Sequence, residues 1–249
     1  MSLTRRQFAQ QSLGGLLTYS LLQTLFVHDA FGDEMKVLAA KWLKDLNDLS
    51  QDVKGAKLKQ TDWQVKVDEL FGQVDLADTL KFIDFEKLTA DIKLRDEGEL
   101  SLRAKLPQVE GLPTNLVFGH QIFALGKDRS VVPHGHNNMA TAFLILKGNF
   151  RGRHFDRLED DGQHMIIRPT IDRAFAPGEH STVSDFKDNV HWFTATSERA
   201  FIFNIHVMNV DPARKDTGRV YLDPNGEKLS DGRIRAKRVT SGEVYKLYG

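Results

Sequence analysis

The spacing of apolar residues along this chain changes once, close to residue 99. Between residues 33 and 92 the apolar positions recur at steps of three and four, which is typical of amphipathic helices. From Glu99 onward apolar and polar residues alternate, as in ELSLRAKL and NLVFGHQIFAL, which is typical of strands with one buried face. The pattern therefore predicts a mainly β protein with an N-terminal α-helical extension.

Four helices are expected in the extension. The first has Asp33 as its N-terminal cap, and the second begins at Thr61, where TDWQ has the form of a capping box. Two shorter helices are expected at residues 76–83 and 85–92. No group of catalytic side chains stands out here, so we expect these helices to pack on the outside of the β region or on another subunit.

The β region consists of short strands separated by turn residues, among them GKD, EDDG, PGEH and DPNG. This pattern predicts a double-sheet jelly roll, and the absence of an internal repeat predicts a single barrel. We expect a hairpin around residues 223–226 and a short C-terminal helix capped by Ser241. The expected domain boundaries are 1–30, 31–95 and 96–249.

The stretch 131–148, VVPHGHNNMATAFLILKG, contains two histidines separated by one residue. In a strand His134 and His136 project to the same face, where two imidazoles can chelate a divalent transition metal. With nine histidines in 249 residues one such pair is common by chance, so the pair alone is a weak motif. The case for a metal site is stronger because Gly148, the flanking strands and a second histidine motif at His191 accompany the pair.

This stretch resembles the first motif of the cupin family, which reads HxH, a short gap, a glutamate, six residues and a glycine. Gly148 stands at the glycine, and Thr141 stands where the glutamate is expected. Cupins without that glutamate tend to hold iron with three histidines. PHGHNNM is similar to Pro-x-His-x-His-Pro-Gly-Met in the thiol dioxygenases related to cysteamine dioxygenase and the plant cysteine oxidases, and the resemblance covers about residues 113–210.

The resemblance also implies a third ligand from the family's second motif. DNVHWFTA matches it at His191, and His180 in APGEHS is the alternative; we favour His191. The metal site implied is therefore Fe(II), or another divalent transition metal, on His134, His136 and His191. The activity implied is oxidation of a small thiol to a sulfinate by dioxygen.

Two departures from that branch concern the substrate. Asn204 replaces an aspartate, and the Pro-Pro-Tyr that follows in the thiol dioxygenases is absent. These differences affect thiol specificity more than metal binding. The alternatives are an iron oxygenase acting on a non-thiol metabolite and an exported cupin that binds a metal or ligand without catalysis.

Further polar residues are expected around the metal. Acceptors for the second ring nitrogens of the ligands are expected from Asn137, Asp188 and Asn189. Catalytic or substrate-binding positions are expected at Arg153, His154, Asn204 and His206, with Arg151 beside them on a strand that could equally face solvent. His120 and His164 are interpreted as ordinary strand or turn histidines.

Composition narrows the classes of partner. Lysine plus arginine and aspartate plus glutamate number 34 each, and there is no basic stripe, which argues against nucleic acid as a partner. The absence of cysteine excludes disulfides, thiolate ligands and a cysteine nucleophile. The resemblance implies a small-molecule substrate, dioxygen and a second copy of the chain, in a homodimer, as partners.

The N-terminus resembles a twin-arginine export signal. Arg5 and Arg6 precede Phe8 in TRRQF, and a mildly apolar run follows over residues 13–27. The signal implies passage through the twin-arginine translocase and a periplasmic or exported protein. Cleavage after Ala30 is disfavoured by His28, and the alternative interpretation is an amphipathic helix of a cytoplasmic protein.

Overall fold

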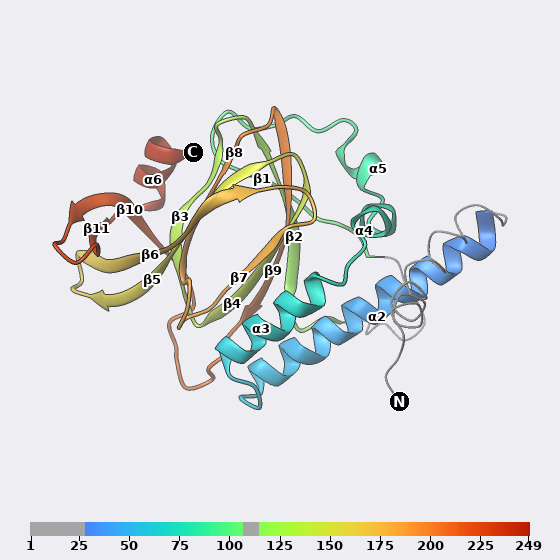
Figure 1. Cartoon of the computed structure of the whole chain (residues 1–249), viewed down its shortest axis with the longest axis horizontal. Coiled ribbons are helices and arrows are strands. Elements are labelled where there is room, and N and C mark those ends of the chain that lie inside the picture. The colour runs from blue at the N-terminus through green and yellow to red at the C-terminus, as the bar shows by residue number, and fades with distance from the viewer. Residues whose placement is uncertain (1–27, 107–114) are drawn as a thin grey trace, which may run out of the picture.

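The computed structural model describes residues 28–106 and 115–249, and it is shown in Figure 1. Residues 1–27 of the expected export segment 1–30, and the short stretch 107–114, lie outside the described residues. The helices are α2 (His28–Lys54), α3 (Gln60–Phe71), α4 (Leu76–Phe82), α5 (Phe85–Thr89) and α6 (Ser241–Tyr248). Within the described part of the chain, no helix is long and apolar enough to cross a membrane.

The strands form two sheets. They are β1 (Leu100–Leu102), β2 (Gly119–Gly126), β3 (Ser130–Asn137), β4 (Met139–Lys147), β5 (Phe150–Asp160), β6 (His164–Phe175), β7 (His180–Val183), β8 (Val190–Ala195), β9 (Arg199–Met208), β10 (Gly218–Lys228) and β11 (Ile234–Arg238). The first sheet has the order β1-β2-β9-β4-β7, and the strands β10-β11-β6-β5-β8-β3 close into a barrel. From β2 to β9 the chain passes repeatedly from one sheet to the other, which is the jelly-roll topology expected from the sequence.

The first sheet buries both of its faces. Its outer face, which includes Ala142, Leu144 and Phe203, packs on residues of α2 and α3 such as Leu46 and Trp63. Its inner face packs on the second sheet through a phenylalanine-rich cluster. The helices α2 and α3 therefore cover the outer face of the first sheet (Figure 1), which is one of the two places expected for them.

Four local expectations were wrong, three helix caps and one hairpin. Ser241 is the first residue of α6, and the N-cap of this helix is Thr240. Asp33 lies inside α2, which begins at His28, and α3 begins at Gln60 without a side-chain cap. The capping box instead occurs at α6, where the Thr240 hydroxyl accepts from the Glu243 N–H and the Glu243 carboxylate accepts from the Thr240 N–H.

The expected hairpin at residues 223–226 is also absent, because β10 continues through this stretch with an irregularity in its pairing to β11. The turn between these strands lies further on, where the Gly232 N–H donates to the Leu229 carbonyl. DPNG is thus a strand irregularity, although its composition is typical of a turn.

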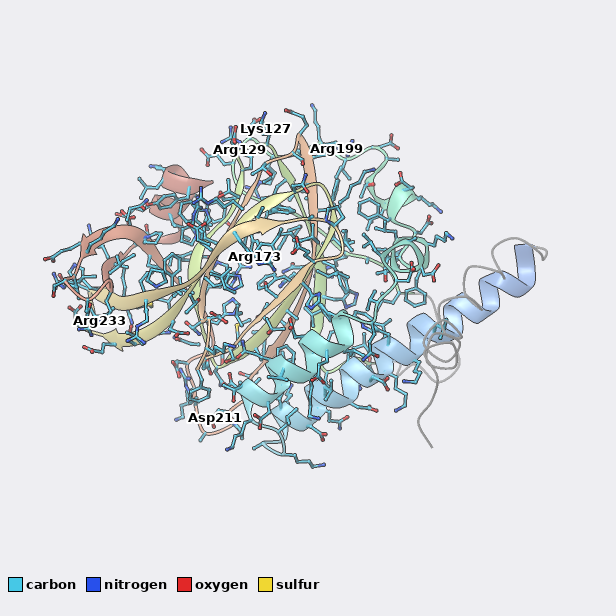
Figure 2. The ribbon with its side chains drawn as sticks, in the orientation of Figure 1. Lys127, Arg129, Arg173, Arg199, Asp211 and Arg233 are labelled. Atoms are coloured by element: carbon cyan, nitrogen blue, oxygen red, sulfur yellow. The ribbon has the colours of Figure 1, made fainter. Side chains whose placement is uncertain are left out.

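The barrel has polar residues at both ends. Figure 2 shows Lys127, Arg129 and Arg199 at one end and Asp211 at the other. The Asp211 end is tied to the turn between β3 and β4, because Asn138 Nδ2 donates to the Asp211 carbonyl and Asn138 Oδ1 accepts from the Asp211 N–H. Asn138 adopts a positive φ of 55° in this turn, so the HxH stretch and the apolar run after it belong to two different strands.

Candidate metal centre

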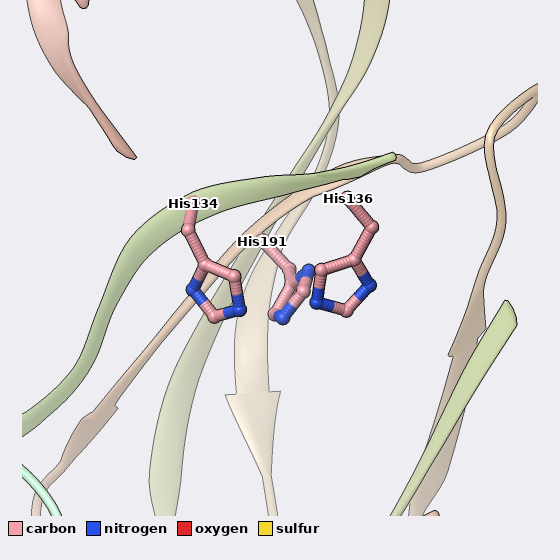
Figure 3. A group of neighbouring side chains, drawn as sticks. All are labelled: His134, His136 and His191. Atoms are coloured by element: carbon pink, nitrogen blue, oxygen red, sulfur yellow. The ribbon is translucent and has the colours of Figure 1, made fainter. Parts of the chain in front are cut away.

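Three buried histidines meet inside the barrel (Figure 3). His134 and His136 lie on β3, and His191 on the neighbouring strand β8 is the direct cross-strand partner of His134. One ring nitrogen from each histidine lies within 4.8 Å of the others. The structure therefore brings His191, rather than His180, to the HxH pair, and this cluster could hold a metal ion.

Hydrogen bonds to the other ring nitrogens leave Nε2 free to face the centre of the cluster. His134 Nδ1 lies 2.7 Å from the Val132 carbonyl oxygen, and His191 Nδ1 lies 3.4 Å from that of Asn189. A carbonyl oxygen only accepts, so Nδ1 carries the proton in a neutral ring and Nε2 keeps its lone pair. The Nε2 atoms of His134 and His191 are buried and have no hydrogen-bond partner among the described residues, as metal ligands require.

His136 is held through its backbone and its ring. The side-chain amide of Asn189 accepts from the His136 N–H at 3.2 Å and donates to the His136 carbonyl at 2.9 Å. The ring nitrogen Nδ1 lies 3.1 Å from Oγ1 of Thr141, the residue at the position of the cupin glutamate. Thr141 is thus a hydrogen-bond partner of a candidate ligand, and this position supplies no carboxylate ligand.

Burial keeps the three rings neutral. It lowers the pKa of His136 to about 3 and those of His134 and His191 well below their ordinary value, because an imidazolium would lose its hydration. The positive charge of Arg219 lowers the pKa values of all three further. Neutral imidazoles are the form that binds divalent metals, so the site has the protonation state that metal binding needs near pH 7.

The cluster forms one wall of a cavity of about 290 Å³. The opposite wall comes from the first sheet and includes Thr141, Asn204 and His206, together with Gln121. Phe123, Phe143, Met139 and Met208 make the cavity partly apolar. Asn204 and His206 therefore lie on one face of β9, as strand alternation predicted. Both line the cavity beside the three-histidine cluster.

Arg153 does not line this cavity. Its guanidinium lies 4.0 Å from the centre of the Trp192 ring, and its neighbour in the register is Trp192, next to the inward His191. Arg151 is also outside, in an ion pair with Asp172 at 2.7 Å. These arginines face outward because they alternate with inward residues along β5. Neither can contact a substrate in the cavity beside the three histidines.

His154 points inward but lies behind the cluster. It is the cross-strand partner of His191, with ring centroids 6.3 Å apart, and it packs on Phe175 and Phe193. The side chain is fully buried, both ring nitrogens lack partners among the described residues, and burial lowers its pKa to about 3. His154 is not among the residues that line the cavity.

The expected acceptors for the ligand rings have other partners. The side chain of Asn137 accepts from Arg157 at 2.6 Å, and Asp188 accepts from Thr170. Asn189 does serve a ligand ring, but through its backbone carbonyl. Strand alternation explains the result for Asn137, because a residue next to a ligand on a strand points its side chain to the opposite face. Asp188 and Asn189 precede β8, which begins at Val190, and the Asn189 side chain is occupied by the backbone of His136.

Three further histidines, His120, His164 and His180, have partners away from the histidine cluster. His180 Nε2 lies 3.2 Å from Asp68 of α3, and the His180 ring packs on Phe71, outside the barrel. His120 Nε2 lies 3.2 Å from the Ala104 carbonyl, and His164 lies beside Asp161 at a turn.

Arg219 is a cavity residue that sequence reasoning did not single out. It lies on β10 directly across from His136 on β3, in a pairing between strands that are far apart in the sequence. The motif GRVYLD carries no local signal for this contact. Gln121, which donates to Asn204 at 3.3 Å, was missed for the same reason.

Comparison with protein-family models gave no match, and comparison with curated proteins gave none either. Among solved structures, a cupin superfamily protein from Desulfitobacterium hafniense is 18% identical with a TM-score of 0.31, over 47% of this chain and 84% of that one. A Klebsiella pneumoniae protein with a double-stranded β-helix domain is 8% identical with a TM-score of 0.34, over 53% and 85%.

An 11S globulin from Wrightia tinctoria, whose structure is described as revealing an auxin-binding site, is 10% identical with a TM-score of 0.31. The match covers 42% of this chain and 22% of the globulin, so the chain spans less than a quarter of that protein. At these TM-scores the likenesses bear on neither the family nor the function of this chain.

Proposed function

We propose that this protein is a metal-dependent oxygenase that holds Fe(II) on His134, His136 and His191 and oxidises a small thiol to a sulfinate. One observation carries the proposal: three neutral imidazoles bring ring nitrogens within 4.8 Å of one another at the wall of a cavity, and no aspartate or glutamate is among the described residues that line it. The resemblance of PHGHNNM and DNVHWFTA to the thiol dioxygenases supplies the reaction type.

The ligand set fits ferrous iron chemistry. Three neutral ligands leave the charge of the ion uncompensated, and a bound ferrous ion supplies open positions for an anionic sulfur and for dioxygen. In the balanced reaction RS⁻ and O₂ give RSO₂⁻, so both oxygen atoms form bonds to sulfur, which loses four electrons to dioxygen. No proton needs to be taken up once the thiol is ionised.

The protein's own groups prepare the cavity for this reaction. Val132, Thr141 and Asn189 fix the ring orientations through Nδ1, so the ligand geometry is set before a metal binds. Phe143 packs against His191 with ring centroids 4.9 Å apart and covers one side of the cluster. Apolar cover of this kind limits water and protects a reactive sulfur species from side reactions.

The test uses the full chain loaded anaerobically with ferrous iron and offered a panel of small thiols. Oxygen uptake that matches sulfinate formation, and that is lost in His191→Ala and kept in His164→Ala, supports the proposal. Iron bound at the three histidines without uptake would contradict the thiol reaction. Uptake with non-thiol metabolites, or ligand binding without turnover, would then support the alternatives given above.

We also propose that the chain is exported by the twin-arginine pathway, on the basis of Arg5, Arg6 and Phe8. This route carries folded proteins, which suits a site that acquires its metal before export. Cell fractionation of the wild-type chain and of the Arg5→Lys/Arg6→Lys variant tests it. Equal distribution of the two proteins would contradict export by this route.

A further inference from the structure

The cavity beside the three-histidine cluster is lined by one side chain that is charged near pH 7 among the described residues, Arg219. Because Arg219 is directly across from His136 in the β10–β3 ladder, the two side chains share a face of the barrel. Facing residues in such a ladder have Cβ atoms about 5 Å apart. Both side chains line the same cavity of about 290 Å³, so one small ligand in it can contact the histidine cluster and Arg219 together.

The position of Arg219 is fixed from two sides. Its Nη1 donates to Oε1 of Glu99 at 3.4 Å, and its guanidinium carbon lies 5.9 Å from the centre of the Phe123 ring. Glu99 is buried, and the Tyr245 hydroxyl of α6 lies 3.0 Å from each of its carboxylate oxygens. Residues from the start of the β region and from the C-terminal helix thus hold the arginine in place.

The hydrogen bond to Glu99 leaves most N–H groups of the Arg219 guanidinium available to a ligand. A guanidinium has five N–H donors, and Glu99 is the one acceptor with which the described residues provide a hydrogen bond to Arg219. The contact with Glu99 is single, so the fork that binds a carboxylate with two parallel hydrogen bonds is not used by the protein. No acidic residue among the described cavity residues competes for it.

We propose that Arg219 is the residue that selects the substrate, and that it binds the carboxylate of a short mercaptocarboxylate whose sulfur lies at the three histidines. This inference rests on the proposed function for the sulfur end of the substrate. Its anionic end rests on Arg219 alone. Glu99 at 3.4 Å balances part of the charge of Arg219, and a divalent ion on the neutral imidazoles would add positive charge to the cavity. This balance favours an anionic substrate over a neutral or cationic thiol.

The experiment uses three thiols of similar size that differ in charge: mercaptoacetate, ethanethiol and cysteamine. The full chain is loaded with Co(II), which does not carry out the oxidation, and thiolate binding is followed by the sulfur-to-cobalt absorption band. We expect mercaptoacetate to bind about 10- to 100-fold more tightly than ethanethiol, with cysteamine weakest. Equal affinities for the three thiols in the wild-type protein would overturn the proposal, and this comparison needs no variant.

Variants then assign the effect to Arg219. In Arg219→Met we expect mercaptoacetate to bind no more tightly than ethanethiol, with the affinity for ethanethiol within about twofold of the wild-type value. In Arg219→Lys we expect part of the preference for mercaptoacetate to remain. The matched control is Arg153→Met on the outer face, which keeps the wild-type preference. A loss of affinity that is equal for mercaptoacetate and ethanethiol in Arg219→Met would overturn the assignment.

Calorimetry with acetate separates this inference from the thiol reaction. If no thiol gives the absorption band but acetate binds the wild-type protein and not Arg219→Met, the anion site stands and the proposed function is wrong. If thiols bind to cobalt without regard to charge and acetate does not bind, the proposed function stands and the role of Arg219 is wrong.

Discussion

Thr141 Oγ1 lies 3.1 Å from Nδ1 of His136, at the position where the cupin motif has its glutamate. The residue that replaces an expected ligand is thus a partner of another ligand. Both groups are fully or almost fully buried, so the hydrogen bond is protected from competition with water. The relationship links metal affinity to a residue that does not itself contact the metal.

We predict that Thr141→Val weakens metal binding by about 10- to 100-fold, because an unrestrained His136 ring loses its orientation and leaves Nδ1 buried without a partner. Thr141→Ser keeps the hydroxyl and is the matched control. Competition for Co(II) with a chelator measures the two affinities. Equal affinities of the Val and Ser variants would show that the hydroxyl has no part in holding the ring.

Alanine at Gly148, the last residue of the motif that begins with HxH, is predicted to destabilise the fold strongly. It has a φ of 72°, and an added Cβ would lie 2.5 Å from the Arg199 carbonyl oxygen and 2.9 Å from the Ala200 Cα. Gly178 is a matched control, with a φ of 87° and open space around an added Cβ.

Alanine at Gly178 should cost only the conformational term of about 1–2 kcal/mol, and alanine at Gly148 should cost more because the backbone of β9 must move. Urea unfolding of Gly148→Ala and Gly178→Ala measures the difference. The prediction fails if the two variants have the same free energy of unfolding.

The features of this structure that the sequence predicts are those that depend on the spacing of residues within one helix or strand. The alternation after Glu99 and the spacing of apolar residues in 33–92 give the two halves of the fold, and the HxH pair lies on one face because a strand alternates. The choice of His191 over His180 as the third ligand came from the resemblance, whereas its register opposite His134 came from the fold. Residue spacing could not show that His154 lies behind the cluster. Two different strands, β3 and β5, flank β8, and only the fold determines which histidine lines the cavity.

The parts that could not be predicted depend on long-range strand pairing or on helix ends. Arg219 reaches the site because β10 closes the barrel against β3, and no motif in GRVYLD indicates this. Asp33 and Thr61 have the composition of helix caps, yet α2 and α3 begin earlier. The free energy of a single cap is small, so cap composition alone does not determine where a helix begins.

The metal-free protein should lose stability as the pH falls below about 6.5. Burial lowers the pKa of His154 to about 3, whereas an unfolded histidine has a pKa of about 6.5. Between these values the unfolded chain binds a proton that the folded chain does not, so the free energy of unfolding decreases as the pH decreases. Above the unfolded pKa neither state is protonated and the contribution is constant. The lowered pKa values of His134, His136 and His191 act in the same direction.

In His154→Leu the unfolded chain binds one proton fewer. The free energy of unfolding should therefore change by about 1.4 kcal/mol less per pH unit between pH 6 and 4 than in the wild type. Chelator-treated wild-type and variant proteins are compared by urea unfolding at several pH values. Identical slopes would mean that His154 is not buried in its neutral form.

Metal titration of the full chain tests the central claim most directly, since the proposed oxygenase reaction depends on the three histidines. Calorimetry with Co(II), supported by metal analysis after gel filtration, should give one ion per chain for the wild-type protein and for His164→Ala. The same titration should give no tightly bound ion for His134→Ala, His136→Ala or His191→Ala, each with a circular dichroism spectrum like that of the wild type. Tight binding of one ion in the folded His variants, or none in the wild-type chain, would contradict the assignment of the metal centre.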